Sequence, residues 1–439
     1  MLNLFDTYNQ LSWDLHFSIF SSGYEIPTVV IEDDGFLPHD VTSPIQYFTG
    51  AKEQEGRPLY FNELPLPPFW EMTANSQEGE IFNLHKKMGH VYFDQKTNNR
   101  FVKEVDWFDE AGRLRFKDKY NNLGYRFART TYTESGQEIQ TAYFKANQEE
   151  VLVENHLSGD LILNHLGQVM IFKDKGQFVR YYLETAGYDL GRVFYNSLST
   201  PLFVAFSLPD DGHDILFWNE PIGDSIPGNM MELLLTHHRN TQIVVQDKEV
   251  YHKILSLVDE QYQSRFHFLG YLYPFKRTNE GRRDVFTLTN SDQLQDLATI
   301  LEQNPKLTFH IAAVTEMSEH LMSYGKYPNI KLYPNISPDV IDHLFNTCDL
   351  YLDINYGNEL PRTLRTAFEN RMPILAFDST CHNHHYVAKE NLFARDNVAG
   401  MNAVLNQLSR NKATFKELLK YQREGADVAT KAQYRDLIN

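Results

Sequence analysis

The residues best placed to do chemistry follow a short apolar strand, in the stretch DINYGNELPRTLRTAFENRMPILAFD from Asp353 to Asp378. We expect Asn358, Glu359 and Arg362 to lie on the turn and on the first turn of the following helix, where backbone N–H groups also point. Their amide, carboxylate and guanidinium groups could hydrogen-bond a sugar or a peptide. No Ser/His/Asp constellation and no glycine-rich phosphate loop can be placed in the sequence. The stretch therefore favours a binding site.

The same stretch resembles the nucleotide-sugar site of retaining glycosyltransferases, in which a helix carries two glutamates eight positions apart and is followed by Gly-x-Pro. Aligned on Pro373, the two glutamates fall on Asn358 and Thr366. Asn358 could still contact a sugar, but Thr366 is too short to reach a ribose. In a register shifted by one residue, Glu359 would be the first carboxylate, and Ala367 would then stand in the second position. The resemblance implies a donor site that has lost its carboxylate pair.

Two neighbouring positions also depart from the pattern of these enzymes. Arg371 replaces the glycine of Gly-x-Pro, at a place where glycine normally permits close backbone approach. The segment HFLGYLYPFKR resembles the loop that brings an Arg and a Lys to the donor diphosphate, and these positions are Tyr271 and Lys276. Tyrosine cannot make a bidentate charged contact. Lys276 is either a remnant of the phosphate site or an ordinary solvated lysine.

Composition limits the classes of protein. The 439 residues, 42% of them hydrophobic, can bury a sizeable core and predict two or three domains. The net charge of −17 disfavours a nucleic-acid partner, because such binding needs Lys and Arg to neutralise phosphates. No apolar run approaches the roughly 18 residues of a transmembrane segment, and the N-terminus lacks a signal peptide. We expect a cytoplasmic protein, with the inner face of the membrane as an alternative location.

The cysteines and clustered histidines do not predict a metal site. Cys348 and Cys381 are too few for a disulfide framework and lack metal-ligand spacing. His382, His384 and His385 form the motif HNHH, but no carboxylate or cysteine completes a recognisable spacing. We therefore expect loop histidines, and neither a metal nor a cofactor.

Both ends of the chain show the alternation of strands and helices that is typical of parallel α/β domains. MLNLF, LSWDLHFSIFSSGYEI and PTVVIEDDGFLP read as strand, helix and strand, and KLTFHIAAV, DLYLDINYG and MPILAFD read as buried strands. We predict a discontinuous N-terminal Rossmann-like domain from residues 1–79 and 184–265. A C-terminal Rossmann-like domain follows at 266–439, with a last helix that braces the structure.

The spacing of apolar residues changes between these two α/β parts of the sequence. Residues 80–183 alternate between aromatic and polar residues and are interrupted by the turns EAGR, ESGQ and HLGQ. This pattern predicts an antiparallel β-meander with one apolar face, inserted into the first domain. Because a sheet with free edges and exposed aromatic residues tends to aggregate or to bind a partner, we expect this insertion to dock a protein.

Together, the two α/β domains, the inserted meander and the altered donor motif resemble the stabilising subunits of bacterial two-subunit O-GlcNAc transferases, the GtfB family. The resemblance covers essentially the whole chain. It implies a fold like that of glycosyltransferase-B enzymes and a catalytic partner that transfers GlcNAc from UDP-GlcNAc to serine-rich-repeat adhesins before their export by an accessory Sec pathway. It also implies that this chain does not transfer sugar, but stabilises that partner and binds the adhesin acceptor, with the two β-insertions pairing.

From these inferences we predict that the former donor cleft holds acceptor peptide or GlcNAc already attached to it. The predicted contact residues are Asn358, Glu359, Arg362, Thr366, Tyr271 and Lys276. Simple helix capping and solvation would explain the charged members of this set equally well. Two other functions stay open at this point: an active retaining glycosyltransferase that uses UDP-GlcNAc with atypical donor contacts, and a scaffold without affinity for acceptor.

Overall fold

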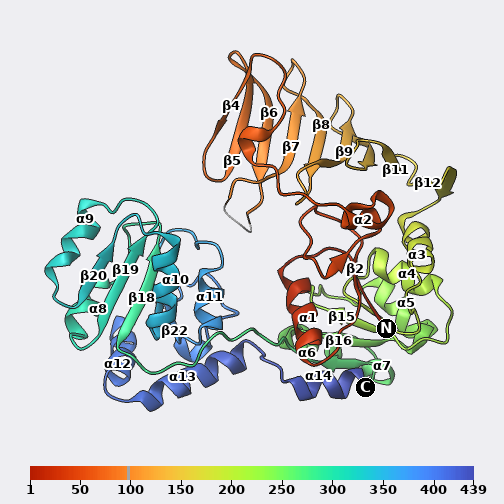
Figure 1. The fold of residues 1–439 in the computed structure, drawn as a ribbon. Coiled ribbons are helices and arrows are strands. Elements are labelled where there is room, and N and C mark those ends of the chain that lie inside the picture. The colour runs from red at the N-terminus through yellow and green to blue at the C-terminus, as the bar shows by residue number, and fades with distance from the viewer. Residues whose placement is uncertain (96–98) are drawn as a thin grey trace. The chain divides into compact units, whose positions relative to one another are not determined.

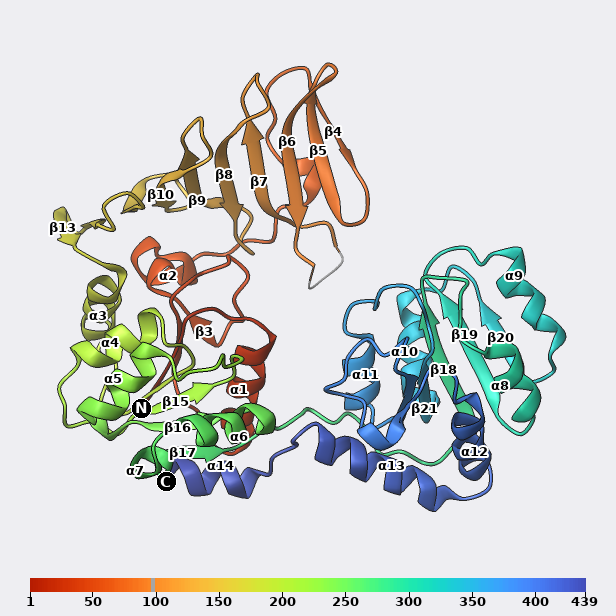
Figure 2. The same cartoon turned by 180° about the vertical axis from the view of Figure 1, so that it is seen from behind.

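A computed structural model describes residues 1–95 and 99–439 and divides the chain into two compact units, Met1–Phe268 and Leu269–Asn439. Each unit contains a parallel sheet with helices, and the first unit also carries a long antiparallel sheet (Figures 1 and 2). The predicted α/β fold class with an inserted β-meander is therefore confirmed. Among the described residues, no helix combines the length and the apolar character needed to cross a membrane.

The parallel sheet of the first unit has seven strands in the order β17-β16-β15-β14-β1-β2-β3. Its central strands are buried on both faces, which explains their continuous apolar sequences. The strands are β1 (Leu2–Phe5), β2 (Thr28–Val30), β3 (Val41–Thr42), β14 (Val193–Tyr195), β15 (Ile215–Trp218), β16 (Gln242–Val245) and β17 (Phe266–Phe268). The helices are α1 (Gln10–Ser21), α2 (Pro44–Thr49), α3 (Lys175–Thr185), α4 (Thr200–Ser207), α5 (Gly228–Thr236), α6 (Lys248–Leu257) and α7 (Glu260–Gln263).

The antiparallel sheet has ten strands that pair in sequence order from β4 to β13. The turns predicted at EAGR, ESGQ and HLGQ each contain a glycine with positive φ, as tight hairpins require. The strands are β4 (Trp70–Ala74), β5 (Glu78–Asn83), β6 (Lys86–Phe93), β7 (Val102–Phe108), β8 (Leu114–Tyr120), β9 (Arg126–Tyr132), β10 (Glu138–Phe144), β11 (Glu150–Asn155), β12 (Leu161–His165) and β13 (Gln168–Phe172). The predicted division at residues 80 and 183 stays a prediction, with Trp70 and Phe172 as the limits of the sheet itself.

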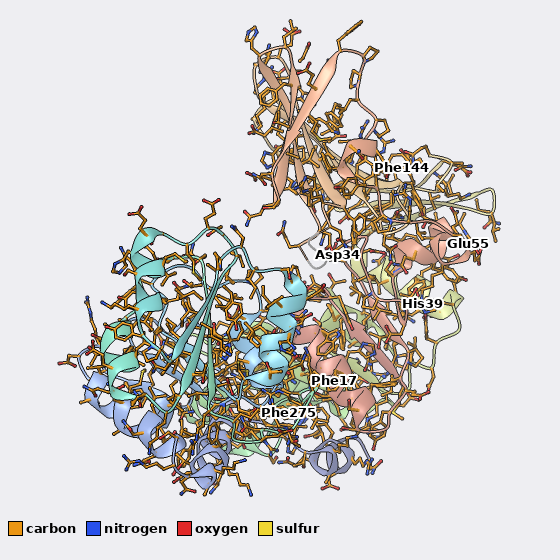
Figure 3. The ribbon with its side chains drawn as sticks, turned by 60° about the vertical axis from the view of Figure 1, so that its left-hand side comes forward. Phe17, Asp34, His39, Glu55, Phe144 and Phe275 are labelled. Carbon is orange, nitrogen blue, oxygen red and sulfur yellow. The ribbon has the colours of Figure 1, made fainter. Side chains whose placement is uncertain are left out.

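Close backbone contacts fix this sheet to the rest of the first unit. Gly35 has a φ of +80°, and a Cβ atom there would lie 2.5 Å from the carbonyl oxygen of Tyr120, so only glycine fits. The carbonyl of Gly35 accepts a hydrogen bond of 2.8 Å from the backbone N–H of Asn122. Beside it, the Lys103 ammonium lies 2.8 Å from the carboxylate of Asp34, which Figure 3 labels. The sheet is thus held by backbone packing and an ion pair.

Three apolar side chains stand out at the two ends of the antiparallel sheet. Phe69 precedes β4, Leu84 lies in the turn after β5, and Leu166 lies in the turn before β13. They are 93%, 83% and 87% exposed. All three have positive φ values, of 70°, 56° and 50°, a conformation that costs an ordinary L-residue about 1–2 kcal/mol. Exposure and backbone strain therefore coincide at these three positions, which we call the apolar turn residues.

The parallel sheet of the second unit has six strands in the order β20-β19-β18-β21-β22-β23. All six strands are parallel, and the order in which strands are added to the sheet reverses between β18 and β21, as in a doubly wound fold. The strands are β18 (Asp284–Thr289), β19 (Thr308–Ala313), β20 (Ile330–Tyr333), β21 (Leu350–Asp353), β22 (Ile374–Phe377) and β23 (Leu392–Phe393). The helices are α8 (Leu297–Gln303), α9 (Glu319–Met322), α10 (Pro338–Thr347), α11 (Thr363–Glu369), α12 (Val398–Leu408), α13 (Lys412–Gly425) and α14 (Lys431–Ile438).

The C-terminal helices close the second unit on itself. Gln422 of α13 donates a hydrogen bond to the carbonyl of Met372 and accepts one from the backbone N–H of Ile374, both inside the core. The Tyr434 hydroxyl of α14 donates a hydrogen bond to the carbonyl of Gly270, at 2.9 Å. These bonds hold the end of the chain against the first residues of the unit. The wider bracing role that the sequence suggested stays a prediction.

Candidate functional site

The candidate site lies at the carboxyl end of β21, on the loop that leads to α11. Asp353 ends the strand, and its carboxylate accepts two hydrogen bonds from His382: one of 2.8 Å from the backbone N–H and one of 2.6 Å at the ring Nδ1. The other ring nitrogen, Nε2, lies 2.6 Å from the carbonyl oxygen of Gly357 in the loop. The hydrogen bond to Asp353 is the main cause that raises the pKa of the His382 imidazole to about 9. His382 therefore ties the loop to the strand.

Four of the predicted contact residues lie on this loop and helix. Asn358 and Arg362 are exposed, and Glu359 is half-buried. Helix α11 begins only at Thr363, so these three residues precede the helix and do not enter its first turn. The Glu359 carboxylate accepts a hydrogen bond of 3.3 Å from the backbone N–H of Leu364, which helps to cap the helix.

Thr366 and Arg362 are linked to each other by the helix. The Thr366 hydroxyl donates to the carbonyl of Arg362 at 2.8 Å, and the Thr366 backbone N–H donates to the same carbonyl. A threonine that bonds back in this way uses its hydroxyl within its own helix. Arg362 itself has a φ of 62°, which turns the chain into α11. Of this pair, the exposed guanidinium of Arg362 is the group left facing solvent.

A buried ion pair on α11 was missed by the sequence analysis. Arg365 and Glu369 are 4% exposed each, and the Arg365 Nε lies 2.7 Å from the Glu369 carboxylate. Lys276 donates its backbone N–H to the carbonyl of Glu369, and its ammonium lies 3.8 Å from the same carboxylate. The Lys276 side chain is 53% exposed, so this contact is weak. The available signal was the spacing of Arg and Glu by four residues, which places both on one face of a helix.

Aromatic rings fill the space beside this ion pair. Phe368 packs against Tyr273, Phe275 and Tyr386, with ring centroids 4.9, 5.5 and 5.0 Å apart. The predicted contact residue Tyr271 is buried at 4% exposure, and its carbonyl accepts a hydrogen bond from the backbone of Ala429. Tyr271 is therefore buried, whereas Asn358 is exposed.

Arg371 keeps the backbone conformation of the glycine that it replaces. Its φ is +52°, and it lies just beyond the end of α11, where helices often end in the left-handed region. Its guanidinium lies over the ring of Phe275, with Cζ 4.8 Å from the ring centre. The interaction of a cation with an aromatic face offsets part of the strain.

The remaining histidines and both cysteines take no metal-like arrangement. His384 is exposed, and the His385 ring nitrogen lies 2.7 Å from the Tyr273 hydroxyl. Burial raises the pKa of both thiols, Cys348 and Cys381, to about 12, so both stay protonated at neutral pH. Within residues 1–95 and 99–439, no group of three or more His, Cys, Asp or Glu side chains could hold a metal ion.

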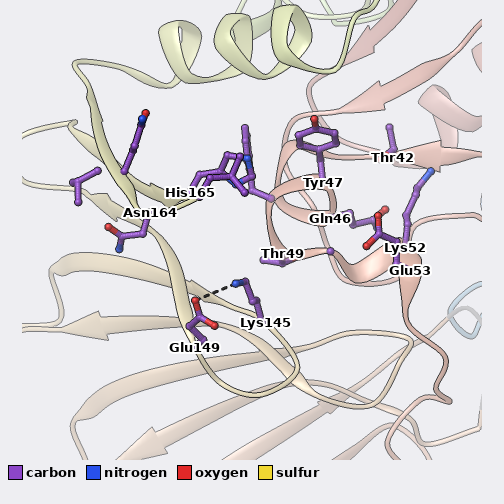
Figure 4. Close-up of a pocket in the computed structure, with 16 residues that line it drawn as sticks. Thr42, Gln46, Tyr47, Thr49, Lys52, Glu53, Lys145, Glu149, Asn164 and His165 are labelled. Carbon is purple, nitrogen blue, oxygen red and sulfur yellow. Dashed lines mark hydrogen bonds and ion pairs between the residues drawn. The ribbon is translucent and has the colours of Figure 1, made fainter.

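The first unit contains cavities that none of the predicted contact residues line. One, of 870 Å³, lies between α2 and the turn from β12 to β13 (Figure 4). Tyr47 and His165 contribute to its wall, and the Lys145 ammonium pairs with Glu149 at 3.0 Å. A smaller one of 270 Å³ is lined by charged residues, including Lys175, which pairs with Glu32 and Glu154.

The geometry of the second unit defines what its site can do. Asp353 is paired with His382, Glu369 is paired with Arg365, and the Glu359 carboxylate caps a helix. Asp353 and Glu369 are buried and engaged in ion pairs, whereas Glu359 is half-buried and makes one hydrogen bond of 3.3 Å through a single oxygen. The exposed Asn358 amide and Arg362 guanidinium offer hydrogen bonds to a neutral polar ligand.

Family models match successive parts of the chain. The GtfB N-terminal domain matches residues 2–48, the GtfB middle domain matches 70–173, and the GtfB third domain matches 175–257. The GftB/GlyA-F C-terminal domain matches residues 285–422. The middle-domain match spans the ten-stranded antiparallel sheet.

Characterised relatives are similar over the full length. One from Streptococcus agalactiae is 41% identical over 439 residues, covering 100% of this chain and 99% of the relative. Another from Streptococcus gordonii is 40% identical, covering 100% of this chain and 98% of the relative. Both are named as the stabilizing protein GtfB of UDP-N-acetylglucosamine–peptide N-acetylglucosaminyltransferase.

Two solved structures are similar to this chain over its full length. A chain in the crystal structure of a GtfA/B complex bound to UDP and GlcNAc is similar with a TM-score of 0.94 at 39% identity, covering 100% of this chain and 99% of the other. A chain of the glycosylation-associated Gap123 complex from Streptococcus agalactiae gives a TM-score of 0.66 at 12% identity, with 100% and 99% covered. The second match indicates a shared fold only.

Proposed function

This chain belongs to the GtfB family of stabilizing proteins, and from that membership we propose that it is the non-catalytic subunit of a protein O-GlcNAc transferase complex. In this role it stabilises a catalytic glycosyltransferase subunit and binds a Ser/Thr-rich adhesin acceptor, both bare and GlcNAc-modified. The proposal includes a cytoplasmic location.

The observation that carries the proposal is the internal pairing of the carboxylates at the carboxyl end of β21. The hydroxyls of a donor sugar and its ribose bind best to ionised oxygens with free lone pairs. The carboxylates of Asp353 and Glu369 are instead paired with His382 and Arg365. At the two positions of the glutamate pair stand Asn358 and Thr366, and the Thr366 hydroxyl bonds within its helix. The hydroxyls of a donor sugar and its ribose would therefore lack the glutamate partners at these two positions, while a neutral amide or hydroxyl ligand would find Asn358.

Docking of the catalytic subunit is assigned to the antiparallel sheet. Its apolar turn residues, Phe69, Leu84 and Leu166, occupy strained positions where Asn or Gly would be less costly. On the edge strand β13, Val169 and Ile171 are also exposed, at 66% and 61%. Exposed apolar side chains on a sheet edge mark a protein contact surface. The similar chain of known structure occurs in a GtfA/B complex, which supports this assignment.

Acceptor binding is assigned to the exposed loop of the second unit, with Asn358 and Arg362 as the contact residues and Glu359 as a helix cap. The other predicted contacts, Thr366, Tyr271 and Lys276, contribute less, because Thr366 bonds within its helix, Tyr271 is buried and Lys276 faces Glu369. A Ser/Thr-rich peptide offers hydroxyl and amide groups, which suit this set of neutral and cationic donors.

The test is the transfer of labelled GlcNAc from UDP-GlcNAc to a Ser/Thr-rich repeat peptide, with this chain alone, its catalytic partner alone and the two mixed. We expect no transfer by this chain alone and strong enhancement in the mixture. Peptide binding to this chain, measured by calorimetry, separates an acceptor-binding subunit from a scaffold, because a scaffold would show no binding heat.

The second candidate function is an active retaining glycosyltransferase with atypical donor contacts. The exposed Lys276, one residue type expected at a donor diphosphate, favours it. Transfer by this chain alone, abolished by Lys276→Ala, would establish this function and exclude the proposed one.

A further inference from the structure

His382 is the histidine whose contacts fix its chemical state at the candidate site. Its Nε2 lies 2.6 Å from the carbonyl oxygen of Gly357, which can only accept, so Nε2 carries a proton. Its Nδ1 lies 2.6 Å from a carboxylate oxygen of Asp353, whose other oxygen accepts the His382 backbone N–H. A ring with an acceptor at each nitrogen is satisfied when both nitrogens are protonated, as imidazolium.

The surroundings of the ring favour the same state. The charged groups that act on it are the carboxylates of Asp353 on β21 and Glu359 on the loop, and both are negative. The neighbouring thiol of Cys381 stays protonated because burial raises its pKa to about 12. An imidazolium therefore interacts favourably with both carboxylates and offsets the charge of Asp353, with which it shares a hydrogen bond.

The loop that His382 holds is tightly built. The backbone N–H of Gly357 donates to the Asn355 side chain at 2.9 Å, and the same oxygen accepts from the Thr289 hydroxyl. A Cβ atom on Gly357 would lie 2.1 Å from the Asn290 side chain, so Asn290 packs directly against Gly357. The carbonyl oxygen of Gly357 also contacts the His382 ring, which joins this loop to the loop after β22. Gly357 is thus held from both sides, one residue before Asn358.

We propose that His382 is a positioning residue which, as an imidazolium, fixes the loop Asn355–Glu359 and so presents Asn358 to an N-acetylhexosamine already attached to the acceptor. The inference rests on the proposed function for its ligand. By neutralising Asp353, His382 also makes this end of β21 suited to a neutral sugar instead of a metal ion or a cation. Sugar specificity then arises because the Asn358 amide is held in place. A mobile amide would lose conformational entropy when it binds the sugar.

The state of the ring is measured first, by ¹⁵N NMR of the full chain labelled at histidine, with the His382 signals identified by their loss in His382→Phe. We expect two protonated ring nitrogens at neutral pH. A neutral ring, with one unprotonated nitrogen, would overturn the proposal whatever the binding result.

Binding is measured next, by calorimetry of the full chain with a GlcNAc-bearing Ser/Thr peptide. We expect His382→Phe to weaken the affinity about tenfold and to speed hydrogen exchange at the Gly357 amide. His382→Gln, which keeps one donor, should lie between the two. His384→Phe, on the same loop but exposed, is the matched control and should bind like the wild type.

The outcomes separate this inference from the proposed function. If the wild-type chain binds no glycopeptide, the proposed function fails, and exchange at Gly357 still tests the loop. If the wild type binds and both His382 variants bind equally well with slow exchange at Gly357, the positioning role is wrong. Loss of binding in His382→Phe with unchanged exchange would also contradict it.

Discussion

The loop after β21 and the turns of the antiparallel sheet differ in the polarity of the side chains that they expose. On the loop, the charges of Asp353 and His382 are paired with each other, and Asn358 exposes a polar amide. At the sheet turns, the most exposed groups are apolar and their backbone is strained, as at Phe69 and Leu166. A surface with satisfied charges suits a small neutral ligand, whereas an apolar strained surface gains most from burial against a protein. Under the proposed function, the polar loop would bind the ligand and the apolar turns would dock the partner subunit.

The largest expected effect comes from breaking the buried pair on α11. Arg365→Ala leaves the Glu369 carboxylate buried without its guanidinium, so the free energy of unfolding should fall by about 3–5 kcal/mol. Urea unfolding followed by circular dichroism measures it. The double variant Arg365→Met with Glu369→Leu should recover most of the loss, because it removes both charges. A small effect of Arg365→Ala alone would mean that the pair does not define this region.

The pH dependence of stability tests the polar loop. The pKa of His382 is raised from 6.5 to about 9 in the folded chain, so its stabilisation is complete below pH 6.5 and is lost as pH rises through about 9. After discounting for solvent screening, we expect a loss of about 1–2 kcal/mol over this window. Urea unfolding of the wild type and His382→Phe at a series of pH values measures the difference. Parallel pH profiles for the two proteins would contradict the assigned ion pair.

A substitution in the turns of the antiparallel sheet should raise the stability of the isolated chain instead of lowering it. Leu166→Asn places a residue that tolerates positive φ at a strained position and should stabilise the isolated chain by about 1 kcal/mol. The same change should weaken the complex with the catalytic subunit, measured by surface plasmon resonance. Leu157→Asn, an exposed leucine of the same sheet without positive φ, is the control. Stabilisation without weaker binding would remove Leu166 from the docking surface.

The smallest expected effect belongs to Glu359, at the border between the loop and α11. Glu359→Ala removes the acceptor for the Leu364 backbone N–H and should cost about 0.5–1 kcal/mol. Glu359→Gln keeps an acceptor oxygen and should cost less. If Glu359→Ala instead abolishes peptide binding with no change in thermal stability, Glu359 is a ligand contact and not a cap.

The fold could be predicted because its signals are local. Alternation of apolar and polar residues marked the antiparallel sheet, and glycines such as Gly112 and Gly136 marked its turns. Continuous apolar runs marked the buried parallel strands. The strand at Trp70–Ala74 lies before the predicted start of the insertion at residue 80, although Trp70, Met72 and Ala74 alternate with exposed residues and pack against the core of the sheet.

The site could be predicted only in part, because its contacts join residues far apart in sequence. The loss of the glutamates at Asn358 and Thr366 was visible from spacing alone. The pairing of Asp353 with His382 was not, since the two stand on different strand ends and meet only through the order of the sheet. The left-handed backbone of Arg371 was likewise hidden, because an arginine gives no sign of a conformation that glycine prefers.

Regaining a sugar donor site at this edge would take several simultaneous mutations. A glutamate at position 358 would add a carboxylate directly before Glu359, while the cations His382 and Arg365 are already paired with Asp353 and Glu369. Removing Arg365 to free Glu369 costs stability before it returns any activity. Each of these single changes is opposed by charge or by packing, so α11 resists a stepwise gain of free carboxylates at this edge of the sheet.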